Sequence, residues 1–379
     1  MQPYICGRFF DGYLIADRFG SQAAKINERK YFELVNLSEN KDAEAPPWLI
    51  SILSSLGQKM KVDAVISDLV QLKRRGTCSF AKASYEITEA CNFRCEHCYL
   101  GEKKNKTLEV DKKKRILDLI DQAGCFWLQI TGGEPLADRD FESVYKYAYA
   151  LGFLIVLSSN GSLLTAPRIT EILEQYPPWR LTVSLYGATN NSYEELTHVR
   201  SSATKVFAGL EWASKRRQRV RLNLIVTKYN KHEVDQMIGI AKGFNFDYHV
   251  FENLTPALDG SRLPLVVAVD ESCREKDCHD VAMASSASGL RCHAGETFFH
   301  VDSKGAMSIC KLSRWPKVDL LASGIEGFKQ LPVIAKQSLK KPTECQKCTI
   351  KSECETCAPK LALYKIGGDI PASVCRRRS

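Results

Sequence analysis

The sequence predicts an α/β protein built around a partial, TIM-like barrel of about six β/α units, with a winged-helix-like module before it and a cysteine-rich segment after it. Three observations support this prediction. Strand-like and helix-like stretches alternate over residues 84–250, as they do in parallel sheets. A hairpin signal and two helix-like stretches come earlier in the chain, and nine of the 15 cysteines come after residue 260. We therefore expect three domains, at residues 1–80, 81–255 and 256–379.

The N-terminal module is expected to begin with a β-hairpin. YICGRFF and GYLIADRF have the composition of strands and flank Asp11-Gly12, a dipeptide typical of tight hairpin turns. AAKINERKYFELVNL is a further strand-like or mixed stretch. PPWLISILSSLGQ and VDAVISDLVQLKRRG have apolar residues at the three- and four-residue spacing of helices. A hairpin followed by helices in about 80 residues suits a small winged-helix-like module.

The central segment is expected to form a parallel sheet. Its predicted strands are SYEIT, WLQIT, FLIVLSSNG, RLTVSLYG, VRLNLIVT and FDYHVFE, and amphipathic stretches such as VDKKKRILDLIDQAG and KVFAGLEWASKR lie between them. Six such units are too few for a closed barrel of about eight, so the barrel is expected to be incomplete. Basic runs at residues 112–115 and 215–217 fall on helix-like stretches, where we expect them to face solvent.

Composition narrows the functional classes. No stretch approaches the ~18 consecutive apolar residues that a membrane span needs, and the N-terminus lacks the pattern of a signal peptide. We therefore expect a cytoplasmic protein with no membrane partner. In that reducing compartment, cysteines in motifs are metal ligands or catalytic groups before they are disulfides. The net charge of +9 is compatible with a nucleic acid, an acidic peptide or no specific partner.

Three cysteines lie within eight residues directly after the first predicted strand of the barrel: Cys91, Cys95 and Cys98. Thiolates are soft ligands that suit zinc or iron–sulfur clusters, and structural zinc usually takes four ligands. An iron–sulfur cube held by three cysteines leaves one iron open to a small molecule. This spacing and its position resemble the radical S-adenosylmethionine (SAM) superfamily. An incomplete zinc site or chance spacing is the alternative.

The resemblance implies a specific chemistry and a set of SAM contacts. A [4Fe–4S] cluster on the three cysteines would chelate SAM through its open iron, and reduction would release a 5′-deoxyadenosyl radical that abstracts a hydrogen from the substrate. TGGEP at residues 131–135 is similar to the family's glycine-rich segment, and SSNG is similar to its ribose-contacting segment. The residues that would bind SAM are Gly132, Gly133, Glu134, Ser159, Asn160, Ser184, Arg200 and His97.

The resemblance also implies individual roles. Glu134 would bind the SAM amino group, and the glycines before it would let the backbone approach the ligand. Arg200 would pair with the SAM carboxylate. His97 stands where related enzymes carry an aromatic residue against the adenine. For Ser184 and Arg200, the alternatives are an ordinary strand-end hydroxyl and a surface arginine.

The C-terminal cysteines have a spacing that resembles the SPASM extension of radical SAM enzymes that modify peptides and proteins. That extension holds two auxiliary [4Fe–4S] clusters, so the resemblance implies three clusters in all. One would use Cys345, Cys348, Cys354 and Cys375, and the other would use Cys292, Cys310 and Cys357, completed by Cys278 or Cys273. Only two residues separate Cys354 from Cys357, where the family's pattern has three. The alternative is a zinc ribbon, which CQKC…CETC alone also suits.

The N-terminal module resembles the PqqD-like domain that recognises ribosomally made precursor peptides and binds the leader as an added β-strand. A capping or dimerisation element is the alternative. Together the resemblances imply a peptide maturase that forms an oxidative crosslink, a thioether or a carbon–carbon bond, with an external electron donor such as flavodoxin or ferredoxin. Three alternatives remain: protein oxidation as in sulfatase maturases, a radical reaction on a small molecule, and a zinc-ribbon nucleic-acid-binding protein. Unranked acid–base candidates near the site are Asp247, His249, Glu252, Tyr186 and Asp302.

Overall fold

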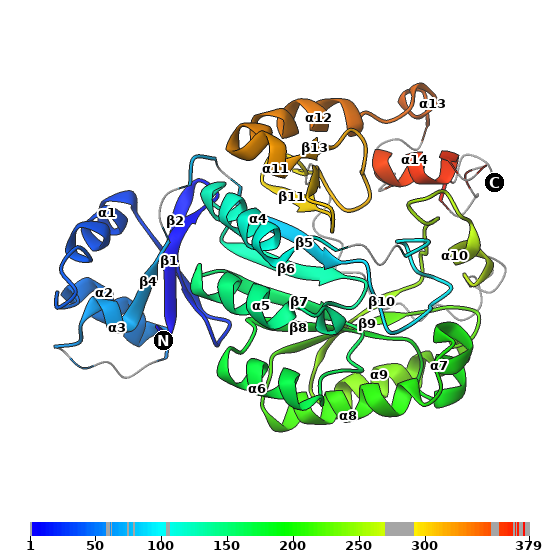
Figure 1. The fold of residues 1–379 in the computed structure, drawn as a ribbon, viewed down its shortest axis with the longest axis horizontal. Helices are drawn as coiled ribbons and strands as arrows, with labels where there is room; N and C mark the ends of the chain where they lie inside the picture. The colour runs from blue at the N-terminus through cyan, green and yellow to red at the C-terminus, as the bar shows by residue number, and fades with distance from the viewer. Residues whose placement is uncertain are drawn as a thin grey trace.

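The computed structural model describes residues 2–57, 61, 63–73, 76–78, 80–103, 107–269, 292–349, 356–366, 368, 370 and 374–375. Figure 1 shows three parts: a small N-terminal module, a central α/β barrel and a C-terminal segment that lies along one side of the barrel. Within these residues, no helix is long and apolar enough to cross a lipid bilayer.

The N-terminal module contains a four-stranded sheet in the order β3-β2-β1-β4. Its elements are β1 (Tyr4–Phe9), β2 (Gly12–Asp17), β3 (Ala23–Ile26), α1 (Glu28–Leu37), α2 (Pro47–Ser55), α3 (Ile66–Leu69) and β4 (Val70–Leu72). The predicted hairpin is confirmed, because β1 and β2 pair antiparallel with Phe9 opposite Gly12. The second predicted helix is wrong over its latter half. Val70–Leu72 pairs in parallel with Tyr4–Cys6, and this pairing overrides the helical spacing of its apolar residues.

The predicted partial barrel is confirmed, with six consecutive parallel strands from β5 to β10. The strands are β5 (Lys82–Thr88), β6 (Trp127–Gly132), β7 (Leu154–Ser159), β8 (Arg180–Leu185), β9 (Val220–Ile225) and β10 (Asp247–Phe251). The connections contain α4 (Val110–Gln122), η1 (Pro135–Ala137), α5 (Phe141–Ala150), α6 (Pro167–Gln175), α7 (Asn190–Thr197), α8 (Ser202–Lys215), η2 (Lys231–Glu233) and α9 (Val234–Gly243).

Alternation along the strands gives the barrel a polar interior. In β8, Leu181, Val183 and Leu185 are buried in the main hydrophobic core together with residues of α4, α5, α6 and α8. Successive strand residues point to opposite faces, so the polar residues between these leucines and valines line the inside. The register continues this polar face across β9, where Ser184 lies opposite Asn223.

The C-terminal segment extends the barrel sheet, which the sequence did not predict. Its strand β11 (Phe298–Val301) pairs in parallel with β5, and β12 (Ala306–Ser308) and β13 (Val318–Asp319) follow antiparallel, giving one nine-stranded sheet. Its helices are α10 (Leu263–Val266), α11 (Leu320–Ser323), η4 (Gly324–Gln330), α12 (Leu331–Ser338), α13 (Thr343–Gln346) and α14 (Ala358–Ile366). The segment therefore shares a sheet with the barrel instead of forming a separate unit.

The two ends of the barrel have different neighbours. The N-terminal module packs on the starts of the strands, where Ile5, Leu14 and Ala16 form a buried cluster with Phe126 and Leu154. Figure 1 shows the module at that end of the strands. The cysteine loop, the glycine-rich segment and the SSNG segment all follow strand ends, so parallel pairing brings them to the opposite end of the barrel.

Candidate active site

The cysteine loop follows β5 and is held against the end of α7. The Arg94 N–H donates to the Thr197 carbonyl at 3.0 Å, and the Glu96 N–H donates to the Leu196 carbonyl at 3.2 Å. The Glu96 carboxylate also accepts the Tyr229 hydroxyl at 2.9 Å. These bonds fix the backbone on either side of Cys95.

The three thiols of this loop lie close together. Burial raises the pKa of Cys95 well above its usual value, and the neighbouring thiols of Cys98 and Cys91 raise it further. Burial also raises the pKa of Cys91, and the Lys103 ammonium opposes that rise. Three soft thiolate donors beside a cation fit an anionic iron–sulfur cluster. Among the described residues, no three His, Cys, Asp or Glu side chains are placed to share one metal ion. A cube does not require that arrangement, because each thiolate binds a different iron.

Asn160 connects the SSNG segment to this loop. Its Nδ2 donates to the Asn92 side-chain oxygen at 2.8 Å and lies 3.9 Å from the Cys91 sulfur. Its Oδ1 accepts the backbone N–H and the hydroxyl of Ser162. The amide is therefore held in one orientation beside the first thiol.

Glu134 is fully buried and joins the glycine-rich segment to the SSNG segment. Its carboxylate accepts the Ser159 hydroxyl at 2.8 Å, the Asn160 N–H at 2.6 Å and the Leu136 N–H at 3.0 Å. Burial raises the pKa of Glu134 to about 7, and these three hydrogen bonds oppose the rise. The carboxylate thus orders the two segments predicted to contact SAM, and its contact with the SAM amino group stays a prediction.

The two glycines of TGGEP occupy positions where the surrounding backbone leaves no room for a side chain. A Cβ on Gly132 would lie 2.2 Å from the Thr88 carbonyl oxygen, and one on Gly133 would lie 2.3 Å from that of Ala90. The Gly133 and Glu134 N–H groups donate to the Thr88 and Ala90 carbonyls, which lead into the cysteine loop. The glycine-rich segment therefore packs directly on the backbone that carries the cysteines.

A Gly133→Ala variant is expected to lose about 2 kcal/mol of unfolding free energy, because backbone atoms that cannot move aside oppose the new methyl group. Urea denaturation measures this loss. Gly239→Ala is the matched control, since no atom lies within 4 Å of its Cβ position in α9. That variant should be unchanged or up to about 1 kcal/mol more stable. Equal midpoints for the two variants would contradict the steric argument.

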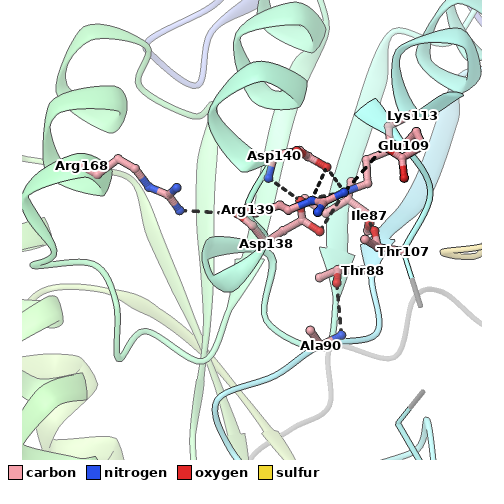
Figure 2. A network of polar contacts seen from close by, with 10 residues as sticks. All are labelled: Ile87, Thr88, Ala90, Thr107, Glu109, Lys113, Asp138, Arg139, Asp140 and Arg168. Atoms are coloured by element: carbon pink, nitrogen blue, oxygen red, sulfur yellow. Dashed lines mark hydrogen bonds and ion pairs between the residues drawn. The ribbon is translucent and has the colours of Figure 1, made fainter. Parts of the chain in front are cut away.

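A buried ion pair fixes the turn that follows the glycine-rich segment (Figure 2). The Lys113 ammonium on α4 donates to both oxygens of Asp138, at 2.7 and 2.8 Å, and contacts Asp140 at 3.1 Å. Lys113 belongs to the basic run that was expected to face solvent, and for this residue the prediction is wrong, because it is fully buried. If the turn moved away, Lys113 would be left as a buried charge without a partner, which is energetically costly. The ion pair therefore holds the turn after η1 in place.

His97 carries an observation that fits the predicted adenine contact. Its Nδ1 is buried and has no hydrogen-bond partner among the described residues. Burial, and then Lys103, lower the pKa of His97 to about 4, so the ring is neutral near pH 7. The ring lies edge-on to Tyr186, with centroids 4.8 Å apart. A neutral ring with one unpaired nitrogen suits a planar, hydrogen-bonding ligand such as adenine.

Ser184 and Arg200 are placed differently from one another. Ser184 lies near the end of β8, and its hydroxyl opposes the rise that burial causes in the pKa of Tyr186, the neighbour of His97. Arg200 lies in the turn between α7 and α8, is exposed, and has no hydrogen bond or ion pair with any described residue. That turn adjoins the cysteine loop through the 3.0 Å contact between His198 and Glu96. Both SAM contacts stay predictions.

Glu86 links the cysteine loop to the C-terminal segment. It lies in the middle of β5 and is almost fully buried. Its carboxylate accepts the hydroxyl of Tyr99, which follows Cys98, at 2.8 Å, and accepts Arg314 at 2.6 and 3.3 Å. His300 of β11 lies 3.5 Å away. Burial alone would raise the pKa of Glu86, but His300 and Arg314 outweigh it and hold that pKa far below its usual range.

Part of the second cysteine set also comes together. Burial raises the pKa of Cys310; the Ser313 N–H opposes this, and the thiols of Cys357 and Cys292 add to the rise. These three thiols therefore lie near one another, and their binding of an auxiliary cluster stays a prediction. In the other set, the Cys348 N–H donates to the Cys345 carbonyl at 3.4 Å. Cys375 is half-buried. Cys273, Cys278 and Cys354 lie outside the described residues.

One acid–base candidate is wrongly placed by the sequence reasoning. Asp247 is the first residue of β10, so it lies at the opposite end of the barrel from the cysteines. Asp302 accepts the N–H groups of Lys304 and Ala306 in the turn after β11, which is a structural role. Tyr186 contacts a predicted SAM residue, His97.

Sequence reasoning missed three residues of the site: Asn92, Lys103 and Glu86. Glu86 had a usable signal, since a carboxylate in the middle of the strand SYEIT must be paired if the strand is buried. Asn92 and Lys103 had none, because their roles depend on contacts with Asn160 and with the folded loop.

Comparison with known proteins agrees with this geometry. Residues 85–240 match the family model of the radical SAM superfamily. The AdoMet-dependent heme synthase of Methanosarcina barkeri is 31% identical, over 44% of this chain and 49% of that protein. The mycofactocin maturase MftC of Mycolicibacterium smegmatis is 26% identical, over 63% of this chain and 60% of that protein. The chain thus spans about half to three fifths of these relatives.

Among solved structures, Streptococcus suis SuiB bound to its precursor peptide SuiA has a TM-score of 0.63 at 15% identity. The superposition covers 99% of both chains, and the two proteins share a fold. The family match, the loop of three cysteines and the unpaired His97 nitrogen all fall within one segment. Residues 85–240 are therefore a radical SAM domain, which implies SAM and a [4Fe–4S] cluster and belongs to a superfamily of enzymes.

Proposed function

We propose that the chain is a peptide maturase that forms an oxidative crosslink, a thioether or a carbon–carbon bond, in a ribosomally made precursor peptide. The observation that carries this proposal is the link between the two cysteine sets. Glu86 bonds both Tyr99, next to Cys98, and Arg314, four residues after Cys310. Glu86 thus connects the backbone next to one cysteine set with the backbone next to the other, which supports an enzyme that combines radical formation with oxidation.

Different residues of the site would bind the cluster and the adenine of SAM. Cys91, Cys95 and Cys98 would hold the SAM-binding [4Fe–4S] cluster, and Lys103 would offset its negative charge. The neutral His97 would present Nδ1 to the adenine. When bound, SAM and its cluster supply the radical that abstracts a hydrogen, and the auxiliary clusters supply an acceptor for the electron that crosslinking releases.

The auxiliary clusters are part of the proposal. Cys292, Cys310 and Cys357 would hold one of them, with Cys278 or Cys273 as the fourth ligand. Cys345, Cys348, Cys354 and Cys375 would hold the other. An external donor such as flavodoxin or ferredoxin would supply the electron that starts each turnover.

Two findings support a peptide substrate. The fold shared with SuiB includes the N-terminal module, and SuiB has been solved with a precursor peptide. MftC, a relative over 63% of this chain, is named a maturase. In the N-terminal module, β3 and β4 are the edge strands, which gives an extended leader two edges on which to add.

The test is anaerobic expression with a precursor peptide encoded beside the gene. We expect about 12 irons per chain, four for each of three cubane clusters, and a peptide that has lost two hydrogen atoms by mass spectrometry. About four irons would remove the auxiliary clusters from the proposal, and stoichiometric zinc in place of iron would favour the zinc-ribbon alternative.

A radical reaction on a small molecule is the second candidate. It is favoured by the names of relatives that match 42 to 44% of the chain, a heme synthase, a nucleotide dehydratase and a GTP 3′,8-cyclase. Formation of 5′-deoxyadenosine that a small-molecule extract stimulates, and that the neighbouring peptide does not, would select this candidate.

A further inference from the structure

Four cations gather at the end of the barrel that lies farthest from the cysteine loop. We call Lys82, Arg180, Arg219 and Arg221 the basic cluster. Lys82 and Arg180 begin β5 and β8, Arg219 immediately precedes β9, and Arg221 is its second residue. Because these strands are parallel, all four residues lie at the strand starts, near the N-terminal module in Figure 1.

The members of the basic cluster are close enough to repel one another. Burial lowers the pKa of Arg180, and Arg221 and Arg219 lower it further, while Asp247 opposes them. Burial also lowers the pKa of Lys82, and Arg180 adds to that shift. Two strands separate β5 from β8 in the sheet, a path of about three strand spacings of 4.8 Å. Lys82 is exposed and lies near enough to Arg180 for the two charges to influence each other.

In the described part of the chain, the carboxylate that influences the basic cluster is Asp247, which is paired in register with Arg221 and opposes the pKa shift of Arg180. None of the cluster's four side chains has a carboxylate within 4.0 Å there. Arg180 Nε and Arg219 Nη1 are buried without a hydrogen-bond partner. Both guanidinium groups lie over the Trp179 ring, at 5.4 and 4.2 Å from its centroid. The three arginine side chains are half-buried and Lys82 is exposed. Because buried donors are normally paired, the two buried nitrogens favour an added acceptor such as an anion.

The space for such an anion is present. A cavity of about 450 Å³ is lined by Arg180, Arg221, Phe246, Asp247 and Tyr248. A neighbouring cavity of about 320 Å³ is lined in part by Arg219 and shares Phe246 and Asp247 with the first. Guanidinium groups match the planar oxygen pairs of phosphate and carboxylate.

We propose that the basic cluster binds an oxyanion, a phosphate or a carboxylate, whose negative charge adds to that of Asp247 in the cavity lining. The two sources of this chemistry are free phosphate and the acidic side chains of a peptide. The site lies at the other end of the barrel from the cysteines, so the proposal is independent of the reaction proposed above.

The test compares the full, anaerobically purified chain with an Arg180→Gln/Arg221→Gln double variant. We measure melting temperature and tryptophan fluorescence, to which Trp179 contributes with four other tryptophans. Inorganic phosphate, a hexaglutamate peptide or a hexaglutamine peptide is added at constant ionic strength. We expect phosphate, hexaglutamate or both to stabilise the wild type and change its fluorescence, and hexaglutamine to do neither. The double variant should bind at least about tenfold more weakly, with a correspondingly smaller stabilisation. The anion that stabilises the wild type shows whether the site binds free phosphate or the acidic side chains of a peptide.

Arg216→Gln is the matched control. Arg216 lies close in sequence but is exposed and already has a carboxylate partner, Glu174 at 2.9 Å. Its loss should leave anion binding unchanged. Without added anion, the double variant should melt at or above the wild-type temperature, because repulsion is removed. A double variant that melts well below the wild type, an equal response of both proteins to anions, or no response of the wild type would each overturn the proposal.

Discussion

A Cys95→Ala variant is expected to lose about four irons per chain and all reductive formation of 5′-deoxyadenosine from SAM. The reason is the geometry of the first cysteine set. Cys95 lies between Cys91 and Cys98, and both neighbours influence its pKa, so its sulfur is central to the group. With two thiolates left, a cube has no stable anchor in the loop.

The measurements are iron and sulfide content after anaerobic reconstitution, and chromatography of 5′-deoxyadenosine after addition of dithionite and SAM. Cys78→Ala is the matched control, because Cys78 is partly exposed, precedes the barrel and belongs to neither cysteine set. It should keep its full iron content and activity. If Cys95→Ala also kept both, the assignment of the cluster to this loop would be wrong.

A Glu86→Gln variant is expected to lose roughly 3–5 kcal/mol of unfolding free energy at pH 7, the usual cost of breaking a buried charged pair. The amide cannot neutralise Arg314, which donates to both carboxylate oxygens, and it disturbs the contact with His300. Since Tyr99 and Arg314 flank different cysteine sets, the same change should loosen both loops.

The stabilising contribution of Glu86 is expected to depend on pH in one direction. The pKa of Glu86 is lower in the folded protein than in the unfolded chain. Its stabilising contribution is therefore fully present above the unfolded pKa of about 4.3, and it is lost as the pH falls below that value. The stability difference between wild type and Glu86→Gln should shrink once the solution is more acidic than that point.

Urea denaturation of both proteins over this pH range measures the effect. Glu142→Gln is the matched control, because Glu142 pairs with Lys146 at 2.8 Å on the surface of α5. A helical surface pair of this kind contributes only about 0.5 kcal/mol. If Glu86→Gln were no worse than this control, the buried network would not be what holds the two cysteine loops together.

The sequence alone predicted the structure correctly where residues close together in the chain determine it. Alternation of strand-like and helix-like stretches predicted the six parallel strands, and the spacing of Cys91, Cys95 and Cys98 predicted three neighbouring thiols. Asp11-Gly12 predicted the first hairpin. In each case the residues that decide the structure are neighbours along the chain.

The sequence was insufficient where residues far apart decide the structure. The stretch around Val70 has helical spacing but forms a strand, because it pairs with β1. Lys113 lies in a basic run but is buried, because its ammonium group forms ion pairs with Asp138 and Asp140. Asp247 was placed near the cysteines although its position at the start of a strand puts it at the other end. Glu86 could not be paired with His300 and Arg314 before the position of β11 was known.

The position of β11 beside β5 has a consequence for biosynthesis. Lys82 and Phe298 are 216 residues apart in the chain, yet they are neighbours in the sheet. While the ribosome is still making the residues after β10, the outer edge of β5 presents unpaired N–H and C=O groups, an edge that can recruit another chain. Nascent chains that stall before β11 should therefore be the species that aggregates and that chaperones retain.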